Sequence, residues 1–401
     1  MKLLHVISSM DPSLGGLSQA IRNLVPPLKK LGAQSEVVSL DAPSAAFLNS
    51  DSFTIHALGP MKGPWSYSAK LTPWLVENFS RFDVVIIHGL WLYHSYSTIK
   101  VLGRLRSATK LNAPKLFVMP HGMLDPYFQR APDRKIKAIR NWLYWKIIES
   151  RVINRADGLL FTCESELLLA REPFSSYFPK REMNVGLGIQ DPPAFVPAMR
   201  EAFIQKCPGL NNRPYILFLG RIHEKKGVDL LINAFIEFAG KSQDKGTRYA
   251  SGLTLVVAGP GLDTAYGQSV QDLVSKAGEL KNSIFFPGML AGDAKWGAFY
   301  GCEAFILPSH QENFGISVAE ALATSKPALI SNQVNICKEI EQAGGGIVAV
   351  DTLEGTKSLL AHWGNLSDEQ RAEMGKRAHN AFKKHFAIEP VAKRFSEAIA
   401  L

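Results

Sequence analysis

Short apolar runs alternate with helical patterns along the chain, and this alternation constrains the fold more than any other feature. Runs of Val, Ile, Leu and Phe without polar alternation are typical of strands buried on both faces, as in parallel sheets covered by helices. The chain therefore predicts an α/β protein. The expected strands of the first half are KLLHVISS (2–9), SEVVSL (35–40), DVVIIHG (83–89), KLFVMPHG (115–122) and ADGLLFTCES (156–165). Those of the second half are PYILFLGRI (214–222), LTLVVAGPG (253–261), SIFFPGM (283–289), EAFILPS (303–309) and PALISN (327–332).

The alternation restarts near residue 214, after the Pro-rich stretch LGIQDPPAFVPAMREAF. At about 100–200 residues per domain, 401 residues suit two doubly wound domains. Ligands of open parallel sheets bind beyond the carboxyl ends of the strands, so we expect a site in the cleft between the domains. The predicted segments are domain 1–190, linker 191–213, domain 214–375 and helical tail 376–401, with a break near Pro390.

Composition excludes several classes of protein. The four cysteines have no CxxC spacing, which argues against a disulfide framework or a zinc ribbon and favours a reducing compartment. The stretch MKLLHVISSM is too short an apolar run for a signal peptide, and no run of about 18 apolar residues predicts a spanning helix. We therefore expect a cytoplasmic protein.

The whole positive excess lies in the first half. Residues 1–190 hold 23 Lys and Arg against 14 Asp and Glu, whereas residues 191–401 hold 22 of each. Within 130–155, eight basic and two acidic residues are interleaved with aromatic ones. This pattern suits an anionic membrane surface, with nucleic acid as a second type of partner and a solvated helix face as the plain alternative.

Two loops of the first half follow expected strands. Gly15 and Gly16 can bring backbone N–H groups close to an anion at the start of a helix, although a Gly-Gly turn is often only a turn. His121 follows a strand directly and precedes a glycine, which favours a functional histidine as much as a structural one. His88 occupies a similar position in IIHGLW and is at most an acceptor-side residue.

Two loops of the second half carry charge. Arg221 and Lys226 precede Gly227 and a helix, and two cations beside a helix N-terminus predict an anion site suited to a diphosphate. After AFILPS, the loop HQENFG places Glu312 where an ionised carboxylate accepts from sugar hydroxyls. The following N–H groups, those of Phe314, Gly315 and Ile316, add the positive end of a helix. Spacing alone makes Glu320 part of a plain polar face with Ser317 and Thr324.

At these residues the chain resembles glycosyltransferase family 4, whose members have the retaining GT-B architecture. The resemblance covers nearly the whole chain. It is carried by GGLSQAIRNLVPPLKKLG, PHGMLDP, GRIHEKKGVDLLI and the Glu-x7-Glu segment PSHQENFGISVAEALATSKPALIS. It implies two Rossmann-like domains facing across a cleft, with a C-terminal helix crossing back to the first domain.

The resemblance also implies site roles. Glu312 contacts the donor sugar and Glu320 the ribose, which reverses the plain interpretation of Glu320. Arg221 and Lys226 hold the diphosphate, with backbone donors at Phe314, Gly315 and Ile316. Gly16 approaches the phosphates, His121 lies beside the sugar, and the base lies near Gly288 and Met289.

The implied reaction moves a hexose from a nucleotide-diphosphate sugar to an acceptor hydroxyl with retention, in bacterial surface polysaccharide, lipopolysaccharide or lipid-linked oligosaccharide synthesis. Because the chain has no Asp-x-Asp, neither a metal nor another cofactor is expected. The acceptor is a glycan or lipid-linked sugar at the inner face of the membrane, and nucleic acid is not expected as a partner. A nucleotide-sugar epimerase, a glycan phosphorylase and a non-enzymatic sugar-binding protein remain as alternatives.

Two positions depart from the family pattern. Ser325 stands in TSKP where the family commonly has glycine, and Cys302-Glu303 stands where an Ala-Asp pair is common.

Overall fold

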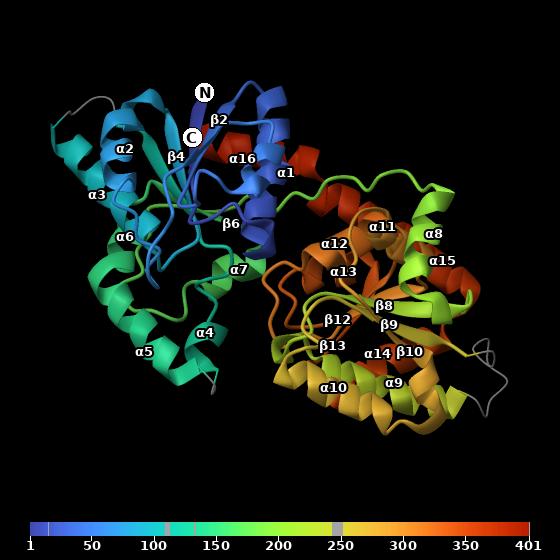
Figure 1. The fold of residues 1–401 in the computed structure, drawn as a ribbon. Helices are drawn as coiled ribbons and strands as arrows, with labels where there is room; N and C mark the ends of the chain where they lie inside the picture. Colours follow the sequence, from blue (N-terminus) through green and yellow to red (C-terminus); the bar gives the residue numbers. More distant parts are fainter. Residues whose placement is uncertain (15, 109–112, 132–133, 243–251, 401) are drawn as a thin grey trace. The chain divides into compact units, whose positions relative to one another are not determined.

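The computed structural model describes residues 1–401 except residues 15, 109–112, 132–133, 243–251 and 401. It divides into two compact units. Unit 1 comprises Met1–Gln190 and the C-terminal helix, and unit 2 comprises Asp191–Ala387. Figure 1 shows the helices and strands of both units.

Unit 1 is built on a seven-stranded sheet in the order β3-β2-β1-β4-β5-β6-β7, and every neighbouring pair is parallel. The register places His5 beside Ile86 and His88 beside Met119. The strands are β1 (Lys2–Val6), β2 (Gln34–Ser39), β3 (Ile55–Ala57), β4 (Val84–His88), β5 (Lys115–Met119), β6 (Gly158–Phe161) and β7 (Glu182–Asn184).

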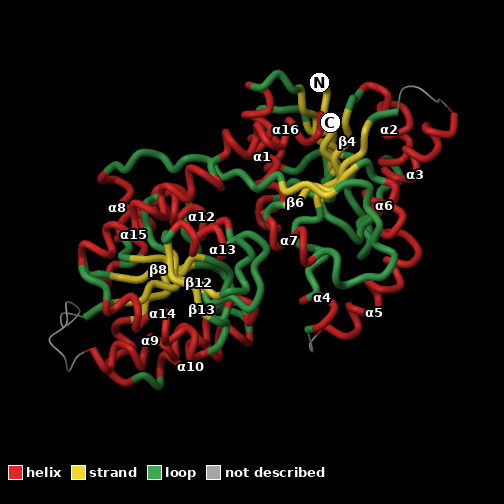
Figure 2. Tube along the Cα trace, turned by 180° about the vertical axis from the view of Figure 1, so that it is seen from behind, coloured by secondary structure: helices red, strands yellow, loops and turns green. Residues whose placement is uncertain are grey.

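Helices cover both faces of this sheet (Figures 1 and 2). The helices α1 (Gly16–Lys30) and α16 (Ile388–Ala400) pack together on one face. The helices α2 (Leu71–Asn78), α3 (Tyr93–Ala108) and α6 (Ser150–Arg155) lie on the other. Unit 1 also contains α4 (Tyr127–Arg130), α5 (Lys135–Tyr144), the π-helical turn Trp145–Glu149, and α7 (Glu164–Leu169).

Unit 2 is built on a six-stranded parallel sheet in the order β10-β9-β8-β11-β12-β13. Its central strands β8, β9, β11 and β12 are almost wholly buried, as expected of strands covered on both faces. The strands are β8 (Tyr215–Leu219), β9 (Thr254–Ala258), β10 (Ile284–Gly288), β11 (Ala304–Leu307), β12 (Ala328–Ser331) and β13 (Gly346–Ala349).

The helices of unit 2 also form two layers (Figure 2). One layer contains α9 (Val228–Ser242), α10 (Ala265–Ser275) and α14 (Leu353–Asn365). The other contains α8 (Pro197–Lys206), α11 (Gly292–Gly301), α12 (Ile316–Ala323), α13 (Cys337–Ala343) and α15 (Asp368–Ala381). The two parallel sheets confirm the predicted pair of doubly wound α/β folds.

All ten expected strands are present, and three further strands appear that the sequence did not predict: β3, β7 and β13. Each lies at an edge of its sheet and has only three or four residues. These strands are at most half-buried for most of their length, so they lack the long apolar runs that identify central strands.

Two connecting segments differ in detail from the expectation. The segment 191–213 contains helix α8, which packs against α11 of unit 2. In the tail, the helical path breaks at Ala387, whose backbone is extended, three residues before Pro390. Pro390 lies in the first turn of α16, where a missing N–H removes no intrahelical hydrogen bond.

Ser325 ends α12 in a left-handed conformation, with φ of 61°. The N–H of Ser325 donates to Leu322 O at 3.0 Å, and the N–H of Lys326 donates to Ala321 O at 2.9 Å. These two bonds form a Schellman motif, whose left-handed position favours glycine. The departure noted in TSKP therefore places a strained serine where glycine fits without strain.

Replacing Ser325 by glycine is expected to stabilise unit 2. Left-handed backbone costs an L-residue about 1–2 kcal/mol, and the greater freedom of glycine in the unfolded chain offsets about 0.4–1 kcal/mol of the gain. Urea unfolding should therefore show Ser325→Gly more stable by about 0.5–1 kcal/mol. Ser325→Ala is the control, since it keeps the strain; equal gains from both variants would contradict the explanation.

Candidate functional site

In unit 2, the loop after β8 lies directly against the loop after β11. Gly227 has φ of 63°, and a Cβ at this position would lie 2.4 Å from the carbonyl oxygen of Pro308. The N–H of His310 donates to Lys225 O across the same contact at 2.9 Å. Only glycine permits this approach, so Gly227 sets the distance between the two charged loops.

The two loops are joined by an ion pair between Lys226 Nζ and Glu312 Oε2. The two side chains are 17% and 19% exposed, so water screens the pair only partly. Burial, followed by the nearby Lys225 and Arg221, lowers the pKa of Lys226 to about 7. Contact with the Glu312 carboxylate acts in the opposite direction, and this direct contact favours the ammonium form. The structure thus brings together two residues that the sequence predicted separately.

Helix α12 begins beside this pair. Gly315 is its N-cap, with φ of 79°, and a Cβ there would lie 3.3 Å from Glu312 Cγ. Phe314 is buried and meets Phe386 edge-to-face at 5.6 Å, which anchors the start of the helix. The first N–H groups of an α-helix have no intrahelical acceptor and carry partial positive charge. Arg221, which is exposed, adds a cation on the loop after β8.

Glu320 lies on α12 and forms an ion pair with Lys295 of α11, with Oε1 and Nζ 2.8 Å apart. Lys295 also lies over the ring of Trp296, 4.3 Å from its centroid. Glu320 is therefore held by a specific partner and is more than a member of a polar face. No sequence pattern singles out Lys295, because a lysine on an ordinary helix resembles any solvated charge.

The predicted base-side residues follow β10. Gly288 ends this strand with φ of 75°, and its carbonyl oxygen accepts from Gly259 N–H at 2.9 Å. Met289 is 71% exposed. A Cβ on Gly259 would lie 1.8 Å from Gly220 O, so the backbone of the loop after β9 is in close contact with that of the loop after β8. The strand ends of unit 2 are thus tied together by backbone contacts.

In unit 1, His121 follows β5 and lies in a row of hydrogen-bonded histidines. His121 Nε2 is 3.0 Å from His88 Nδ1, and His88 Nε2 is 2.9 Å from His5 Nδ1. Burial lowers the pKa values of His121 and His5 to about 4. Burial, then repulsion from His5, His121 and His94, places the pKa of His88 well below its usual value. The imidazole of His121 is therefore neutral near pH 7.

The loop carrying His121 is held by a buried carboxylate that the sequence did not single out. Glu166 Oε1 accepts from Gly122 N–H at 2.5 Å, and Glu166 Oε2 accepts from Thr162 N–H at 2.7 Å. Glu166 thereby ties the loop after β5 to the loop after β6. His5 and Glu166 were missed because both contribute through contacts between strands that are distant in the sequence.

Gly16 is the first residue of α1 and is exposed, whereas Gly15 lies outside the described residues. The loop before α1 is fixed by Asp41. Asp41 Oδ2 accepts from Met10 N–H at 2.7 Å, and Asp41 Oδ1 accepts from Ser9 Oγ at 2.5 Å. Gly16, His88 and His121 thus lie at or just beyond the carboxyl ends of β1, β4 and β5 in one unit.

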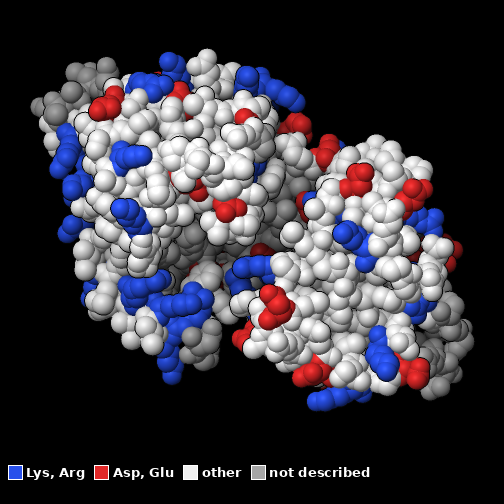
Figure 3. Space-filling view, in the orientation of Figure 1, with Lys and Arg blue, Asp and Glu red and all other residues white. Residues whose placement is uncertain are grey.

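Helix α5 and the π-helical turn after it expose a stripe of large apolar side chains among basic ones. Figure 3 shows Lys and Arg gathered where Figure 1 places α4 and α5. The apolar members of this surface, called the α5 patch, are Ile136, Ile139, Trp142, Leu143 and Ile147. Its exposed basic members are Lys135, Lys137, Arg140 and Lys146.

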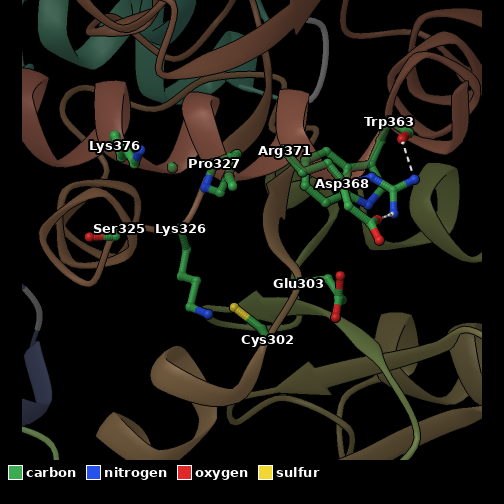
Figure 4. Close-up of a pocket in the computed structure, with 11 residues that line it drawn as sticks. Cys302, Glu303, Ser325, Lys326, Pro327, Trp363, Asp368, Arg371 and Lys376 are labelled. Carbon is green, nitrogen blue, oxygen red and sulfur yellow. Dashed lines mark hydrogen bonds and ion pairs between the residues drawn. The ribbon is translucent and has the colours of Figure 1, made fainter. Parts of the chain in front are cut away.

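A cavity of about 300 Å³ lies elsewhere in unit 2, at the amino-terminal edge of the sheet (Figure 4). Cys302 and Glu303 precede β11, and Lys326 precedes β12. Arg371 donates from Nη2 to the carbonyl oxygen of Trp363 at 2.9 Å. This cavity is at the opposite end of the strands from Lys226 and Glu312. Since ligands of doubly wound sheets bind at the carboxyl ends, we assign the candidate site to the latter.

Among the described residues, no group of three or more His, Cys, Asp and Glu side chains is arranged to hold a metal ion. No helix in the described ranges is long and apolar enough to cross a membrane. The four cysteines are buried and form no disulfide.

Comparison with protein families identifies both halves of the chain. Residues 199–381 match the family model for glycosyl transferases group 1, and residues 15–184 match the glycosyl transferase 4-like domain. A GDP-mannose-dependent alpha-mannosyltransferase of Mycolicibacterium smegmatis is 23% identical over 82% of this chain and 79% of the relative. The lipopolysaccharide core biosynthesis mannosyltransferase LpsB of Rhizobium meliloti is 28% identical over 51% of this chain and 56% of its own.

Solved structures show the same fold. The crystal structure of Anabaena HepE in complex with UDP and glucose matches with a TM-score of 0.74 at 15% identity. The match covers 100% of this chain and 99% of that chain. This similarity confirms the expected GT-B fold.

Acidification is expected to destabilise unit 1 between about pH 6.5 and 4. The folded unit keeps His5, His94 and His121 neutral because burial lowers their pKa values to about 4, whereas an unfolded histidine protonates near pH 6.5. The unfolded state then binds more protons. The free energy of unfolding therefore decreases as the pH is lowered, by up to about 1.4 kcal/mol per pH unit for each histidine. Urea unfolding at several pH values measures the slope.

The control is His94→Gln, whose amide can still donate to the His88 carbonyl but does not titrate. In this variant, the slope of the free energy of unfolding against pH should decrease by an amount that corresponds to about one proton. Burial raises the pKa of Glu149 to about 7, which acts in the opposite direction, so the test is the comparison of the two proteins. Equal pH dependence of His94→Gln and the wild-type protein would show that His94 titrates normally when folded.

Proposed function

The chain belongs to the group 1 glycosyltransferases, and from this premise we propose that it is a retaining, metal-independent hexosyltransferase. It transfers a sugar from a nucleotide-sugar donor to an acceptor hydroxyl. The comparisons favour transfer over epimerisation, phosphorolysis or binding without turnover. Retention and metal independence are proposed from the residues of unit 2, and the donor and acceptor classes are proposed from the relatives.

The observation that carries the proposal is the Lys226–Glu312 pair at the start of α12. A cation, a carboxylate and a helix N-terminus within one loop contact provide complementary groups for a sugar diphosphate. The ammonium and the helix N–H groups bind phosphate oxygens, and the carboxylate accepts from sugar hydroxyls. When the donor binds, Lys226 exchanges part of its contact with Glu312 for the diphosphate.

The other residues take roles on the same basis. Arg221 is a second cation for the diphosphate, and Glu320, oriented by Lys295, accepts from the ribose hydroxyls. Gly288 and Met289 flank the base. In unit 2, the backbone donors proposed are those of Phe314, Gly315 and Ile316. In unit 1, the role proposed for Gly16 is that of a backbone donor, and the role proposed for His121 is contact with a sugar.

Metal independence follows from the cations of the chain itself. Negative charge builds on the leaving diphosphate as the glycosidic bond breaks, and positioned cations and N–H groups stabilise it. Arg221 and Lys226 provide this charge without a bridging ion. Retention corresponds to attack of the acceptor on the face from which the diphosphate departs.

The donor and acceptor classes are proposed from the relatives. One is named for GDP-mannose and one for lipopolysaccharide core synthesis, so GDP-mannose is the first donor to test. The solved neighbour holds UDP, which makes UDP-hexoses the second class. The acceptor proposed is a lipid-linked or surface glycan.

Nucleoside diphosphates are expected to stabilise the protein through Lys226. A ligand at a hundred times its dissociation constant raises the free energy of unfolding by about 2.7 kcal/mol. Thermal unfolding with GDP, UDP, ADP, TDP and CMP, in EDTA, should show one strong diphosphate response. Lys226→Met should abolish the response, whereas Lys326→Met, in the cavity at the other edge of the sheet, should keep it. Loss of the response in Lys326→Met alone would contradict the assignment.

Glu312→Gln separates sugar transfer from nucleotide binding. The amide keeps the shape of the side chain but removes the charge beside Lys226, so diphosphate binding should persist or tighten. Sugar transfer should fall about 10²–10³-fold, the usual effect of losing one positioned polar group. Product formation in EDTA tests metal independence, and the anomer of the product, seen by NMR, tests retention. An inverted product would refute retention, and full activity of Glu312→Gln would refute the role of Glu312.

We also propose that the α5 patch binds the cytoplasmic face of an anionic membrane. Its outward apolar stripe suits the acyl boundary, and the surrounding lysines and arginine suit anionic headgroups. Lys146 lies over the Trp142 ring at 4.0 Å, a pairing that suits an interface with one wet and one apolar side. Such contact would bring the enzyme to a lipid-linked acceptor.

The membrane proposal predicts sedimentation with vesicles of phosphatidylcholine and phosphatidylglycerol, and little with phosphatidylcholine alone. The double variant Ile139→Glu, Leu143→Glu removes burial of about 1.5–3 kcal/mol per side chain, so affinity should fall about 100-fold or more. Leu31→Glu, a similarly exposed leucine outside the patch, is the control. Unchanged binding of the double variant would refute the role of the patch.

A further inference from the structure

The histidine row of unit 1 crosses three neighbouring strands. His5 lies on β1, His88 ends β4, and His121 follows β5. The N···N distances are 2.9 Å and 3.0 Å, and the neighbouring ring centroids are 5.2 Å and 5.3 Å apart. His5 and His88 are enclosed, whereas His121 is partly exposed. The row therefore connects the interior of the sheet with the loop residue proposed to contact the sugar.

The row can be protonated in two directions. A neutral imidazole has one N–H donor and one bare acceptor nitrogen, so His88 donates to one neighbour and accepts from the other. If the protons point towards His121, His5 Nε2 is a bare acceptor. If they point away, His5 Nε2 carries a buried N–H. This atom is buried and has no hydrogen-bond partner among the described residues.

His94, on α3, provides a nearby example of a buried histidine whose tautomer is determined by its hydrogen bond. Its Nε2 lies 3.0 Å from the carbonyl oxygen of His88, and a carbonyl only accepts, so Nε2 carries the proton. His94 Nδ1 is then a bare acceptor, and it too is buried without a partner among the described residues. Buried backbone N–H groups without a partner are likewise rarer than carbonyls that accept too few bonds. Both points favour protons directed towards His121.

We infer that His5 and His88 are positioning residues that hold His121 as the neutral tautomer protonated on Nδ1. His5 Nδ1–H donates to His88 Nε2, and His88 Nδ1–H donates to His121 Nε2. The inference deepens the proposed function and rests on it for the role of His121 towards the sugar. The tautomer itself is a property of unit 1 alone.

The surroundings support a neutral, fixed ring. Two titratable groups on adjoining elements contact the backbone of the row: His94 on α3 contacts the His88 carbonyl oxygen, and Glu166 on α7 contacts the residue after His121. Glu166 accepts from the backbone N–H of Gly122 and from Thr162. His121 has φ of 53°, a strained left-handed conformation that persists only where neighbouring contacts enforce it. The strained backbone at His121 thus fixes the position from which the imidazole extends.

A fixed tautomer decides what His121 offers a ligand. Its Nε2 is occupied as the acceptor of His88, so the ring cannot act as a general base through that atom. Its Nδ1–H is a donor, which must meet an acceptor such as a sugar oxygen. His121 therefore binds and orients the sugar and moves no proton in the reaction.

The test uses the full-length enzyme with ¹⁵N-labelled histidine. Long-range ¹H–¹⁵N correlation spectra distinguish the two neutral tautomers, and His121→Asn assigns the His121 signals by their disappearance. We expect the Nδ1–H tautomer, unchanged from about pH 6 to 8, since burial keeps the ring neutral there. The Nε2–H tautomer, or an imidazolium at about pH 7, would overturn the inference.

Matched variants test the direction of the row. His88→Asn retains an amide N–H near the place of Nδ1 and should preserve the His121 tautomer and most of kcat, whereas His88→Leu should mix the tautomers. His88→Leu should lower kcat about tenfold, the equivalent of one hydrogen bond, with little change in KM for the donor. Equal damage by both variants would contradict the inference.

His5 gives a second comparison at a residue that is wholly enclosed. His5→Asn keeps a donor to His88, whereas His5→Leu removes it and should populate both tautomers of His121. The ¹⁵N signals of His94, whose ring bonds to the backbone carbonyl of residue 88, should persist in all four variants and show that unit 1 is folded. Nucleoside diphosphate binding shows the same for unit 2. Absence of sugar transfer in the wild type would count against the proposed function, while the spectra would still decide the tautomer.

Discussion

The contact between Gly227 and the carbonyl oxygen of Pro308 is the constraint on which the candidate site of unit 2 depends. A Cβ would lie 2.4 Å from that oxygen, so any other residue would push the loops after β8 and β11 apart. That separation would break the contact between Lys226 and Glu312 and move both from the start of α12. Gly259 has the same effect between the loops after β9 and β8. The ion pair of the site thus depends on the close approach of two backbone segments, which only glycine permits.

The two units place different chemistry at the carboxyl ends of their strands. Unit 2 presents charge, with Arg221, Lys226 and a helix N-terminus near Glu312, as binding of a diphosphate and a sugar requires. Unit 1 presents neutral histidines, because burial opposes their protonation. Neutral donors and acceptors discriminate among hydroxyl groups without attracting the strongly charged diphosphate.

Much of the fold could be predicted from the sequence because central strands carry unbroken apolar runs and the restart near residue 214 separates two units. The edge strands β3, β7 and β13 could not, because short, half-buried strands lack that signal. Lys226 and Glu312 were predicted as neighbours of one ligand, and the structure joins them directly. The role of Glu320 could not be decided from its spacing. Its partner Lys295 could not be predicted, because their contact depends on the packing of α11 and α12. The row of His5 and His88 depends on strand register, which no local pattern specifies.

The measurement that tests this account most directly is a crystal structure of the protein with the nucleoside diphosphate that binds best. The account predicts phosphate density against Lys226, Arg221 and the first N–H groups of α12, with the ribose at Glu320. Phosphate density in the cavity lined by Lys326 and Arg371, at the other edge of the sheet, would contradict it.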